Sequence, residues 1–246
     1  MLNGFISCIT LQSFSHYVTG RGYLDNSRTW ETWSPLASTT LSSRSLQVEL
    51  TGNLFPSDYA AYAFAAALLV LIVSEVLGGT VIPNMKRRGA KVQRKSRGTG
   101  VLVYVAWILV FGISVSLGES GVLLLPAWFT YVGDAVVLAG VALRQWAIAV
   151  LGRYFSGVIG VQQDQKVIET GPYHSIRHPS YAGVLLILIG IATSMLSLAA
   201  VAAAFLLFWL GYGYRMLVEE KVLVSELGDS YVDYMRRTKR IIPFLL

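Results

Sequence analysis

The stretch DYAAYAFAAALLVLIVSEVLGG, residues 58–79, is a long and almost uninterrupted apolar run. It carries one charged residue near each end, and a helix of this length, rising about 1.5 Å per residue, crosses the ~30 Å hydrocarbon core of a bilayer. The whole chain agrees, because 54% of its 246 residues are hydrophobic and only 14% are charged. A soluble domain carries about a quarter charged residues. The sequence therefore predicts an integral membrane protein.

Four further apolar stretches set the expected number of membrane spans. They cover about residues 101–117, 128–151, 180–195 and 197–217. Almost nothing separates the last two, so we expect them to form an antiparallel helical hairpin. The sequence thus predicts an all-α, multi-pass membrane domain over residues 56–246, with about five transmembrane helices.

Basic residues gather in one loop, which orients the predicted helices. Residues 86–97, KRRGAKVQRKSR, hold seven of the 20 lysines and arginines. Loops of this kind lie on the cytoplasmic side of a membrane and touch anionic lipid head groups. With five spans, the loop at 152–179 and the tail from Arg215 fall on the same side. No aromatic side chains interleave the basic loop, so it lacks the stacking surface of a nucleic-acid-binding segment.

Residues 1–55 differ from the rest of the chain. They are rich in serine and threonine, as in SPLASTTLSSRS (34–45), and show no sustained periodicity. The N-terminus lacks a basic region followed by a long apolar core, so we do not expect a signal peptide. We expect a poorly ordered tail, or an extension upstream of the true start, without a role in function. The single cysteine, Cys8, cannot supply a disulfide framework or a multi-cysteine metal site, and we expect no metal.

The segment GPYHSIRHPSYAG, residues 171–183, places polar and ring-bearing side chains just ahead of an apolar run. Pro179 fits the first turn of the helix that follows, where its missing N–H costs nothing. His178 then lies at the helix start, beside unpaired backbone N–H groups and the positive end of the helix dipole. The segment is either a membrane-interface loop anchored by tyrosine and arginine side chains or one wall of a binding site.

Further charged residues lie close to the predicted spans. Glu219 and Glu220 directly follow the fifth span, where acids are costly unless they are solvated or paired. They belong either to a solvated helix extension, with Arg215 one turn before Glu219, or to a site for a bound cation. Arg144, about two turns from the end of the third span, either reaches the interface or faces the bundle and holds an anion. Glu75 lies near the inner end of the first span, and the sequence does not decide whether it reaches the interface or faces the bundle.

Together these segments resemble the isoprenylcysteine carboxyl methyltransferase family and its phospholipid methyltransferase relatives. The resemblance rests on GPYHSIRHPSYAG, on EEKVL at 219–223 and on LGDSYVDYMRRTKRIIPF at 227–244. It covers roughly residues 100–246. The segment LRQWAIAVLGRYFS at 143–156 also resembles the part of the family's sequence that precedes the motif found here as GPYHSIRHPSYAG. An R-H-P-x-Y motif combined with an acid pair at this spacing is much more specific than either piece alone.

The resemblance implies a helical membrane enzyme that binds S-adenosylmethionine (SAM) in a cytoplasmic pocket, formed by the loop before the fourth helix and by the C-terminal helix. A lipophilic acceptor is expected to reach the methyl group from the bilayer. The residues implied to bind the cofactor are Gly171, Pro172, Tyr173, His178, Tyr181, Glu219 and Glu220. Arg177 and Glu220 are the implied catalytic residues, and Arg177 and Arg144 are the candidates for holding the acceptor.

The chemistry of SAM suits these residue types. Acids suit its sulfonium and ammonium, arginine and helix-start N–H groups suit its carboxylate, and aromatic rings suit its adenine. The main interpretation of the acceptor is a prenylcysteine-like carboxylate, and the alternative is a lipid amine. A sterol-reductase-like NADPH enzyme is a further alternative, although the acid pair favours a cationic cofactor. A transporter or scaffold is the non-enzymatic alternative, but the sequence shows no internal repeats or broken midplane helices.

Overall fold

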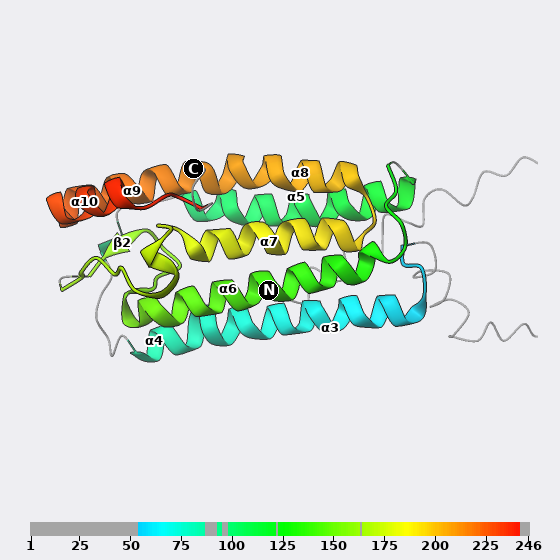
Figure 1. Cartoon of the computed structure of the whole chain (residues 1–246), viewed down its shortest axis with the longest axis horizontal. Helices are drawn as coiled ribbons and strands as arrows, with labels where there is room; N and C mark the ends of the chain where they lie inside the picture. The colour runs from blue at the N-terminus through cyan, green and yellow to red at the C-terminus, as the bar shows by residue number, and fades with distance from the viewer. Residues whose placement is uncertain (1–53, 87–92, 95–97, 122, 163, 242–246) are drawn as a thin grey trace, which may run out of the picture. The chain divides into compact units, whose positions relative to one another are not determined.

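A computed structural model describes residues 54–86, 93–94, 98–121, 123–162 and 164–241. Most of residues 1–55 and most of the basic loop at 86–97 lie outside these ranges, so the expectations for them stay predictions. The described part is mostly helical, as the sequence predicts (Figure 1). Its longer helices are α3 (Asp58–Ser74), α5 (Thr99–Ser120), α6 (Phe129–Leu151), α7 (Pro179–Ser194), α8 (Leu198–Phe208), α9 (Tyr214–Leu227) and α10 (Asp229–Arg237).

Short elements extend or connect these helices. Two π-helical segments continue α3 and α8, so that each becomes part of a longer helical run. Strands β1 and β2 pair antiparallel, with Gln93 opposite Val161, and tie the loop after α6 to the segment before α5. The short elements are η1 (Glu75–Val81), α4 (Ile82–Lys86), β1 (Gln93–Arg94), η2 (Gly152–Tyr154), β2 (Gly160–Val161), η3 (Gly171–His174) and η4 (Trp209–Gly213).

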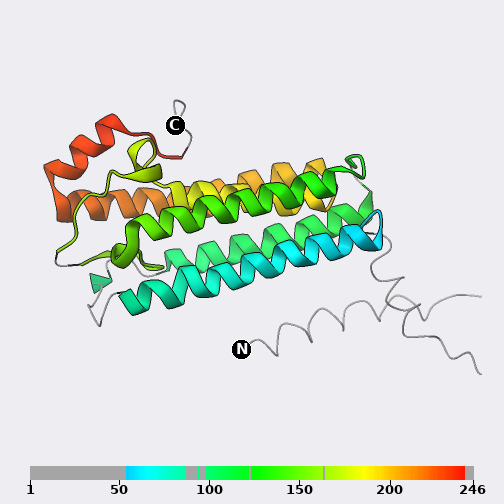
Figure 2. The ribbon, with the colours of Figure 1, turned by 60° about the horizontal axis from the view of Figure 1, so that its bottom comes forward.

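Within the described residues, four helical runs are long and apolar enough to cross a membrane. The remaining one of the five predicted spans is α7, an apolar helix of only 16 residues. Most of α7 is buried among α5, α6 and α8 (Figures 1 and 2). A helix sheltered in this way can be shorter than the bilayer because its neighbours, rather than its own surface, meet the lipid. The four longer runs are Asp58–Met85, Thr99–Ser120, Phe129–Tyr154 and Leu198–Leu227.

Two predicted spans ended too early. The first was expected to end at residue 79 and the fifth at residue 217, but the helical runs continue to Met85 and to Leu227. The apolar pattern stops where the side chains become polar, whereas backbone hydrogen bonding continues past that point. The extension of the last run is important because it carries Glu219 and Glu220.

Glycine residues bring α6 and α7 into close contact. A Cβ atom added to Gly140 would lie 2.7 Å from the carbonyl oxygen of Gly183, and one added to Gly183 would lie 2.7 Å from that of Gly140. Small residues allow membrane helices to approach and to gain van der Waals contact, which drives their association in lipid. This close pair carries Arg144 on α6 and Ser180 on α7 toward the same end of the bundle.

The hairpin of α7 and α8 is confirmed. Only residues 195–197 separate the two helices, and the hydroxyl of Ser197 caps α8 by accepting from the N–H of Ala200. At the other end of α7, Pro179 occupies the first turn as predicted, and His178 is the residue before the helix. The predicted site segment therefore lies at the start of a buried helix.

The chain that follows α10 runs beside the residues just before α7. The N–H of Arg177 donates to the carbonyl of Lys239 at 2.7 Å, and that of His178 donates to Arg240 at 2.9 Å. The N–H of Lys239 donates in turn to the carbonyl of Ser175 at 3.2 Å. Two segments far apart in the sequence are thereby joined by backbone bonds at the end of the bundle where α9 and α10 lie (Figure 1).

Candidate active site

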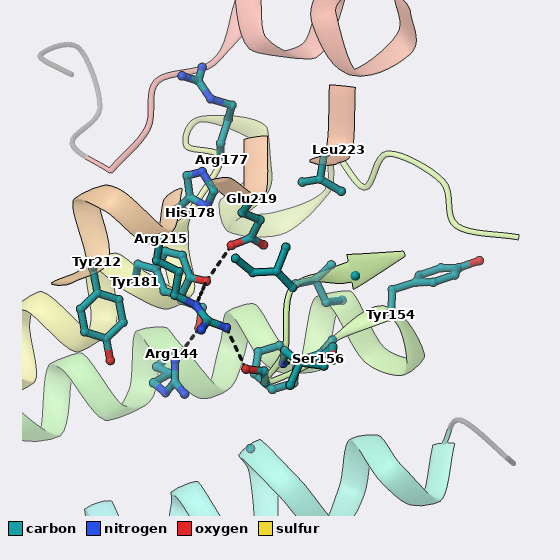
Figure 3. Close-up of a pocket in the computed structure, with 18 of the residues that line it drawn as sticks. Arg144, Tyr154, Ser156, Arg177, His178, Tyr181, Tyr212, Arg215, Glu219 and Leu223 are labelled. Carbon is teal, nitrogen blue, oxygen red and sulfur yellow. Dashed lines mark hydrogen bonds between the residues drawn. The ribbon is translucent and has the colours of Figure 1, made fainter. Parts of the chain in front are cut away.

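A cavity of about 660 Å³ lies at this end of the bundle. One part of its wall is apolar and comes from α3 and α5, with residues such as Leu71, Val103 and Trp107. The other part carries polar side chains from the start of α7, from α9 and from α10. Figure 3 shows His178 and Tyr181 of the first of these segments, and Arg215 and Glu219 of α9. Of the predicted site residues, Arg144, Tyr173, Arg177, His178, Tyr181 and Glu219 line the cavity, whereas Gly171, Pro172 and Glu220 lie outside its lining.

Tyr181 links two charged side chains of α9 across the polar wall. Its hydroxyl donates to Oε2 of Glu219 at 2.6 Å and accepts from Nε of Arg215 at 2.8 Å (Figure 3). Arg215 also donates through Nη2 to the carbonyl of Gly157 at 2.7 Å. The pairing of Arg215 with Glu219 that their spacing suggested is therefore indirect, through the phenol. These bonds hold α7, α9 and the loop after α6 together.

Glu219 presents a carboxylate to the cavity. Its oxygen accepts the Tyr181 bond, and no lysine or arginine of the described ranges forms an ion pair with it. An acid in this position favours a cationic ligand. In the same ranges, His, Cys, Asp and Glu side chains form no group of three or more that could hold a metal ion.

Glu220 has different surroundings, because consecutive helix positions lie about 100° apart around the axis. Its side chain is 5% exposed and is neutralised by its neighbours. Oε1 accepts from Nε of Arg177 at 2.9 Å and lies 3.3 Å from Nε2 of His178. Oε2 accepts from Nη2 of Arg240 at 2.9 Å. Glu220 thus joins α9 to the start of α7 and to the tail after α10.

Arg177 is among the residues that line the cavity, but its guanidinium points away from the other labelled residues and is held on two sides (Figure 3). Besides Glu220, its Nη1 donates to the carbonyl of Met235 at 3.0 Å and to that of Thr238. The ring of the next residue, His178, stacks on that of Tyr181, with centroids 5.4 Å apart and planes 10° apart. This arrangement fixes the R-H-P-x-Y segment against the end of α10.

Three buried tyrosines complete the polar wall. Burial raises the pKa of the hydroxyls of Tyr173, Tyr231 and Tyr234, so all three stay protonated and can donate hydrogen bonds. The hydroxyl of Tyr234 donates to the carbonyl of Tyr173 at 2.7 Å. Gly171 and Pro172 form the turn before Tyr173, and Gly171 has a φ of 59°, a left-handed conformation that favours glycine. They place Tyr173 instead of lining the cavity.

The side chain of Arg144 faces the interior of the helix bundle and does not extend to the membrane interface. This is the second of the two alternatives given for this residue. Its side chain is 15% exposed and forms a two-pronged ion pair with Glu75, with Nε–Oε1 at 2.5 Å and Nη2–Oε2 at 2.9 Å. Its Nη1 donates to the hydroxyl of Ser180 at 2.7 Å. Two charges of opposite sign from separate spans thus satisfy each other, as intramembrane charges usually do. Arg144, Glu75 and Ser180 all line the cavity.

Some residues of the site carried no clear signal in the sequence. Trp107 on α5 donates through Nε1 to the hydroxyl of Tyr212 at 2.9 Å, and both line the cavity outside any motif. The same is true of Gly157 and Val158 in the loop after α6. Arg240 could have been suspected, because a buried acid requires a cationic partner and the run RRTKR at 236–240 offers several.

Sequence relatives point to one family. Residues 133–225 match the model of the isoprenylcysteine carboxyl methyltransferase (ICMT) family. A probable protein-S-isoprenylcysteine O-methyltransferase of Oryza sativa subsp. indica is 28% identical over 192 residues, which cover 75% of this chain and 96% of that protein. The protein-S-isoprenylcysteine O-methyltransferase of Tribolium castaneum is 30% identical over 120 residues, which cover 48% of this chain and 43% of that protein.

A solved structure has the same fold. The eukaryotic intramembrane Ras methyltransferase ICMT superposes with a TM-score of 0.56 at 24% identity, over 76% of this chain and 68% of that chain. The segment that matches the family model, residues 133–225, includes Arg144, the R-H-P-x-Y segment and the acid pair. Motif, fold and sequence relatives agree, and the chain is similar to the isoprenylcysteine carboxyl methyltransferase family, whose model matches residues 133–225.

Proposed function

We propose that this methyltransferase uses SAM to methylate the carboxylate of a prenylcysteine-like acceptor held in the membrane. The observation that carries the proposal is the composition of one cavity wall. Glu219 offers a carboxylate that forms no direct ion pair with a lysine or arginine in the described chain, Arg144 offers a guanidinium, and α3 and α5 add an apolar surface. A cationic donor, an anionic acceptor group and an apolar tail each find a complementary surface there. The names of the relatives favour a carboxyl acceptor over the lipid amine.

The cavity suits SAM in size and in chemistry. Its volume of about 660 Å³ falls within the roughly 300–1,000 Å³ of small-molecule sites. Glu219 holds the cationic end of the cofactor, and the rings of His178, Tyr181 and Tyr173 offer apolar faces to the adenine. When bound, SAM supplies an electrophilic methyl group on its sulfonium. The chain's own task is to orient that group and to exclude water from it.

Glu220 and Arg177 act by holding the wall of the cofactor site in place. Glu220 gathers Arg177, His178 and Arg240, so its charge is already compensated before a ligand binds. Arg177 fastens the end of α10, which carries part of the wall. We assign these residues to positioning, and we assign Gly171 and Pro172 to the placement of Tyr173.

Arg144 holds the carboxylate of the acceptor. An α-carboxyl has a reference pKa of about 3.3–3.7, so it is ionised at neutral pH and needs no general base. The chain has to align the carboxylate oxygen with the transferred methyl group, at about 3–3.5 Å, and to keep water away. Arg177 is the second candidate for this contact, since it is also among the lining residues, but Glu220 and two carbonyls already engage its guanidinium.

The prenyl tail enters between α3 and α5. Ile72, Val76 and Tyr104 line the cavity and are also 59%, 53% and 73% exposed. Residues that border both the cavity and the outer surface mark an opening, and on membrane-spanning helices such an opening meets acyl chains. A lipophilic acceptor can therefore reach Arg144 without leaving the bilayer.

The cavity faces the cytoplasm. The basic segment at 86–97 follows α4, and α4 lies at the same end of the bundle as α9 and α10 (Figure 1). Loops rich in lysine and arginine are retained on the cytoplasmic side. The support for this orientation is therefore the charge of the basic segment, which follows from the sequence independently of the cavity.

Methyl transfer by the purified chain in nanodiscs tests the proposal. Labelled SAM is supplied with an N-acyl-S-farnesylcysteine carrying a free carboxyl, and with the same molecule carrying a carboxamide. We expect a base-labile methyl ester from the acid and no product from the carboxamide. Methylation of an aminolipid in place of the acid would support the lipid-amine alternative. Absence of transfer by protein that binds SAM would overturn the proposed acceptor.

A further inference from the structure

The guanidinium of Arg144 already holds a carboxylate in this structure. Its Nε and Nη2 face the two carboxylate oxygens of Glu75, at 2.5 and 2.9 Å, and its Nη1 is bonded to Ser180. The edge formed by Nε and Nη2 is the planar fork with which arginine binds carboxylates. An acceptor carboxylate that comes to Arg144 therefore meets an edge occupied by a chemically equivalent group.

The contact between Glu75 and Arg144 is built by the surrounding backbone. The π-helical segment η1 begins at Glu75, and π-helical turns in longer helices are frequent at functional sites. Gln145, the neighbour of Arg144, donates through Nε2 to the carbonyl of Ser74 at 3.1 Å. Gly78 leaves room for this bond, because a Cβ there would lie 1.7 Å from Oε1 of Gln145. Two adjacent residues of α6 thus bond to the side chain of Glu75 and to the backbone just before it.

The two partners differ in how firmly they are held. The side chain of Arg144 is 15% exposed and has a second anchor in Ser180. The side chain of Glu75 is 33% exposed, and in the described part of the chain it accepts hydrogen bonds from Arg144 only. Both line the same cavity. Glu75 can therefore turn away into the cavity while Arg144 stays in place.

We propose that Glu75 is an internal competitor for the acceptor carboxylate at Arg144 and determines the selectivity for an ionised acceptor. The inference rests on the proposed function. An ionised acceptor replaces Glu75 because it brings the same carboxylate together with a tail that gains apolar contact. A neutral head group, such as an amide or an ester, leaves Glu75 on Arg144 because it offers no charge in exchange.

The same competition assists product release. As the acceptor oxygen bonds to the methyl carbon, the bond from that carbon to the sulfonium sulfur breaks and its electron pair stays on sulfur. The negative charge of the acceptor and the positive charge of the sulfonium disappear together. The ester that results no longer attracts Arg144, and Glu75 returns to the vacated fork. One contact therefore favours the substrate before the transfer and disfavours the product after it.

Binding of the acid and of its carboxamide analogue to the full chain tests the proposal, with S-adenosylhomocysteine present to block turnover. Glu75→Gln keeps the size of the side chain and removes its charge. We expect the affinity for the N-acyl-S-farnesylcysteine acid to rise on the order of tenfold, and the affinity for the carboxamide to change less than about twofold. In turnover we expect a lower KM for the acid, while inhibition by the methyl ester, which is neutral like the carboxamide, changes little.

Ser180→Ala is the matched control. It removes the other side-chain contact of Arg144 without removing a competing carboxylate, so acid affinity stays the same or falls. Glu75→Asp keeps a competitor and preserves the preference for the acid over the carboxamide. Unchanged or weaker acid binding by folded Glu75→Gln protein, with S-adenosylhomocysteine still bound, overturns the competitor. If the unmodified chain binds S-adenosylhomocysteine but neither analogue, the proposed acceptor fails and the competitor role fails with it.

Discussion

Tyr181 donates a 2.6 Å hydrogen bond to Glu219 and so orients the carboxylate that faces the cavity. The same hydroxyl accepts from Arg215, so one phenol holds an acid and a base of α9 against the first turn of α7. Hydrogen bonds to charged groups are roughly twice as strong as neutral ones. The position of the acid that we assign to the cofactor therefore depends on a residue of the R-H-P-x-Y motif.

Tyr181→Phe tests the contribution of the hydroxyl of Tyr181 separately from that of its ring. The substitution keeps the stack on His178 but removes both hydrogen bonds of the phenol. Because Glu219 and Arg215 each lose a partner worth about 1.5–3 kcal/mol, we expect SAM affinity to fall at least tenfold. Calorimetric titration of SAM into the purified variant measures this. Wild-type affinity would show that Glu219 needs no orientation by Tyr181.

Glu219→Gln removes the charge that the cavity offers to a cation. We expect weaker binding of SAM, while S-adenosylhomocysteine, which lacks the sulfonium, is affected less. Folding should change little, because no lysine or arginine in the described chain pairs with Glu219. Titrating both ligands into the variant gives the comparison. An equal loss for the two ligands would move the contact from the sulfonium to a part that they share, such as the ammonium or the ribose.

Glu220→Gln should act first on stability. Removing this buried charge leaves Arg177 and Arg240 without their shared counter-ion. Breaking a buried ion pair costs about 3–5 kcal/mol, and this corresponds to a drop in Tm on the order of 10 °C. Thermal unfolding of Glu219→Gln, measured in the same detergent, is the reference. Equal Tm values for the two variants would contradict the different roles assigned to these adjacent acids.

The membrane helices could be predicted because lipid imposes a simple rule on sequence. An apolar run long enough for a bilayer is visible at 58–79, and the helix found there begins at Asp58. The end of this helical run could not be predicted from the sequence. The segments η1 and α4 extend the run to Met85, and the apolar pattern of EVLGGTV in η1 is weaker than that of α3. The enclosure of α7 was hidden for another reason, although the span predicted at 180–195 has the same length as the helix. Hydropathy does not distinguish a helix that faces lipid from one that is enclosed by other helices.

The site could be predicted in part. The resemblance predicted that Tyr181, His178 and Glu219 lie at one cavity. It predicted the same for Glu220, which lies outside the lining. The difference between the two acids depends on the rotation of α9 and on Arg240, which arrives from a distant segment. The pairing of Glu75 with Arg144 was within reach, since opposite charges near the same end of two spans tend to satisfy each other. The π-helical segment that places Glu75 left no recognisable pattern.

Gly183→Ala and Gly112→Ala form a matched pair that tests the packing beneath the site. A methyl group on Gly183 would lie 2.7 Å from the carbonyl of Gly140 and 2.8 Å from Cβ of Arg144, whereas one on Gly112 would meet nothing within 4 Å. Overpacking costs about 1–3 kcal/mol, but alanine in an open helix position gains roughly 0.5–1 kcal/mol over glycine. We therefore expect thermal unfolding to show a lower Tm for Gly183→Ala and an equal or higher Tm for Gly112→Ala. Because the added methyl group also pushes against Arg144, the first variant should bind the acid acceptor less tightly. Equal stability of the two variants would mean that α6 and α7 can separate without cost, and that Arg144 is not held by their contact.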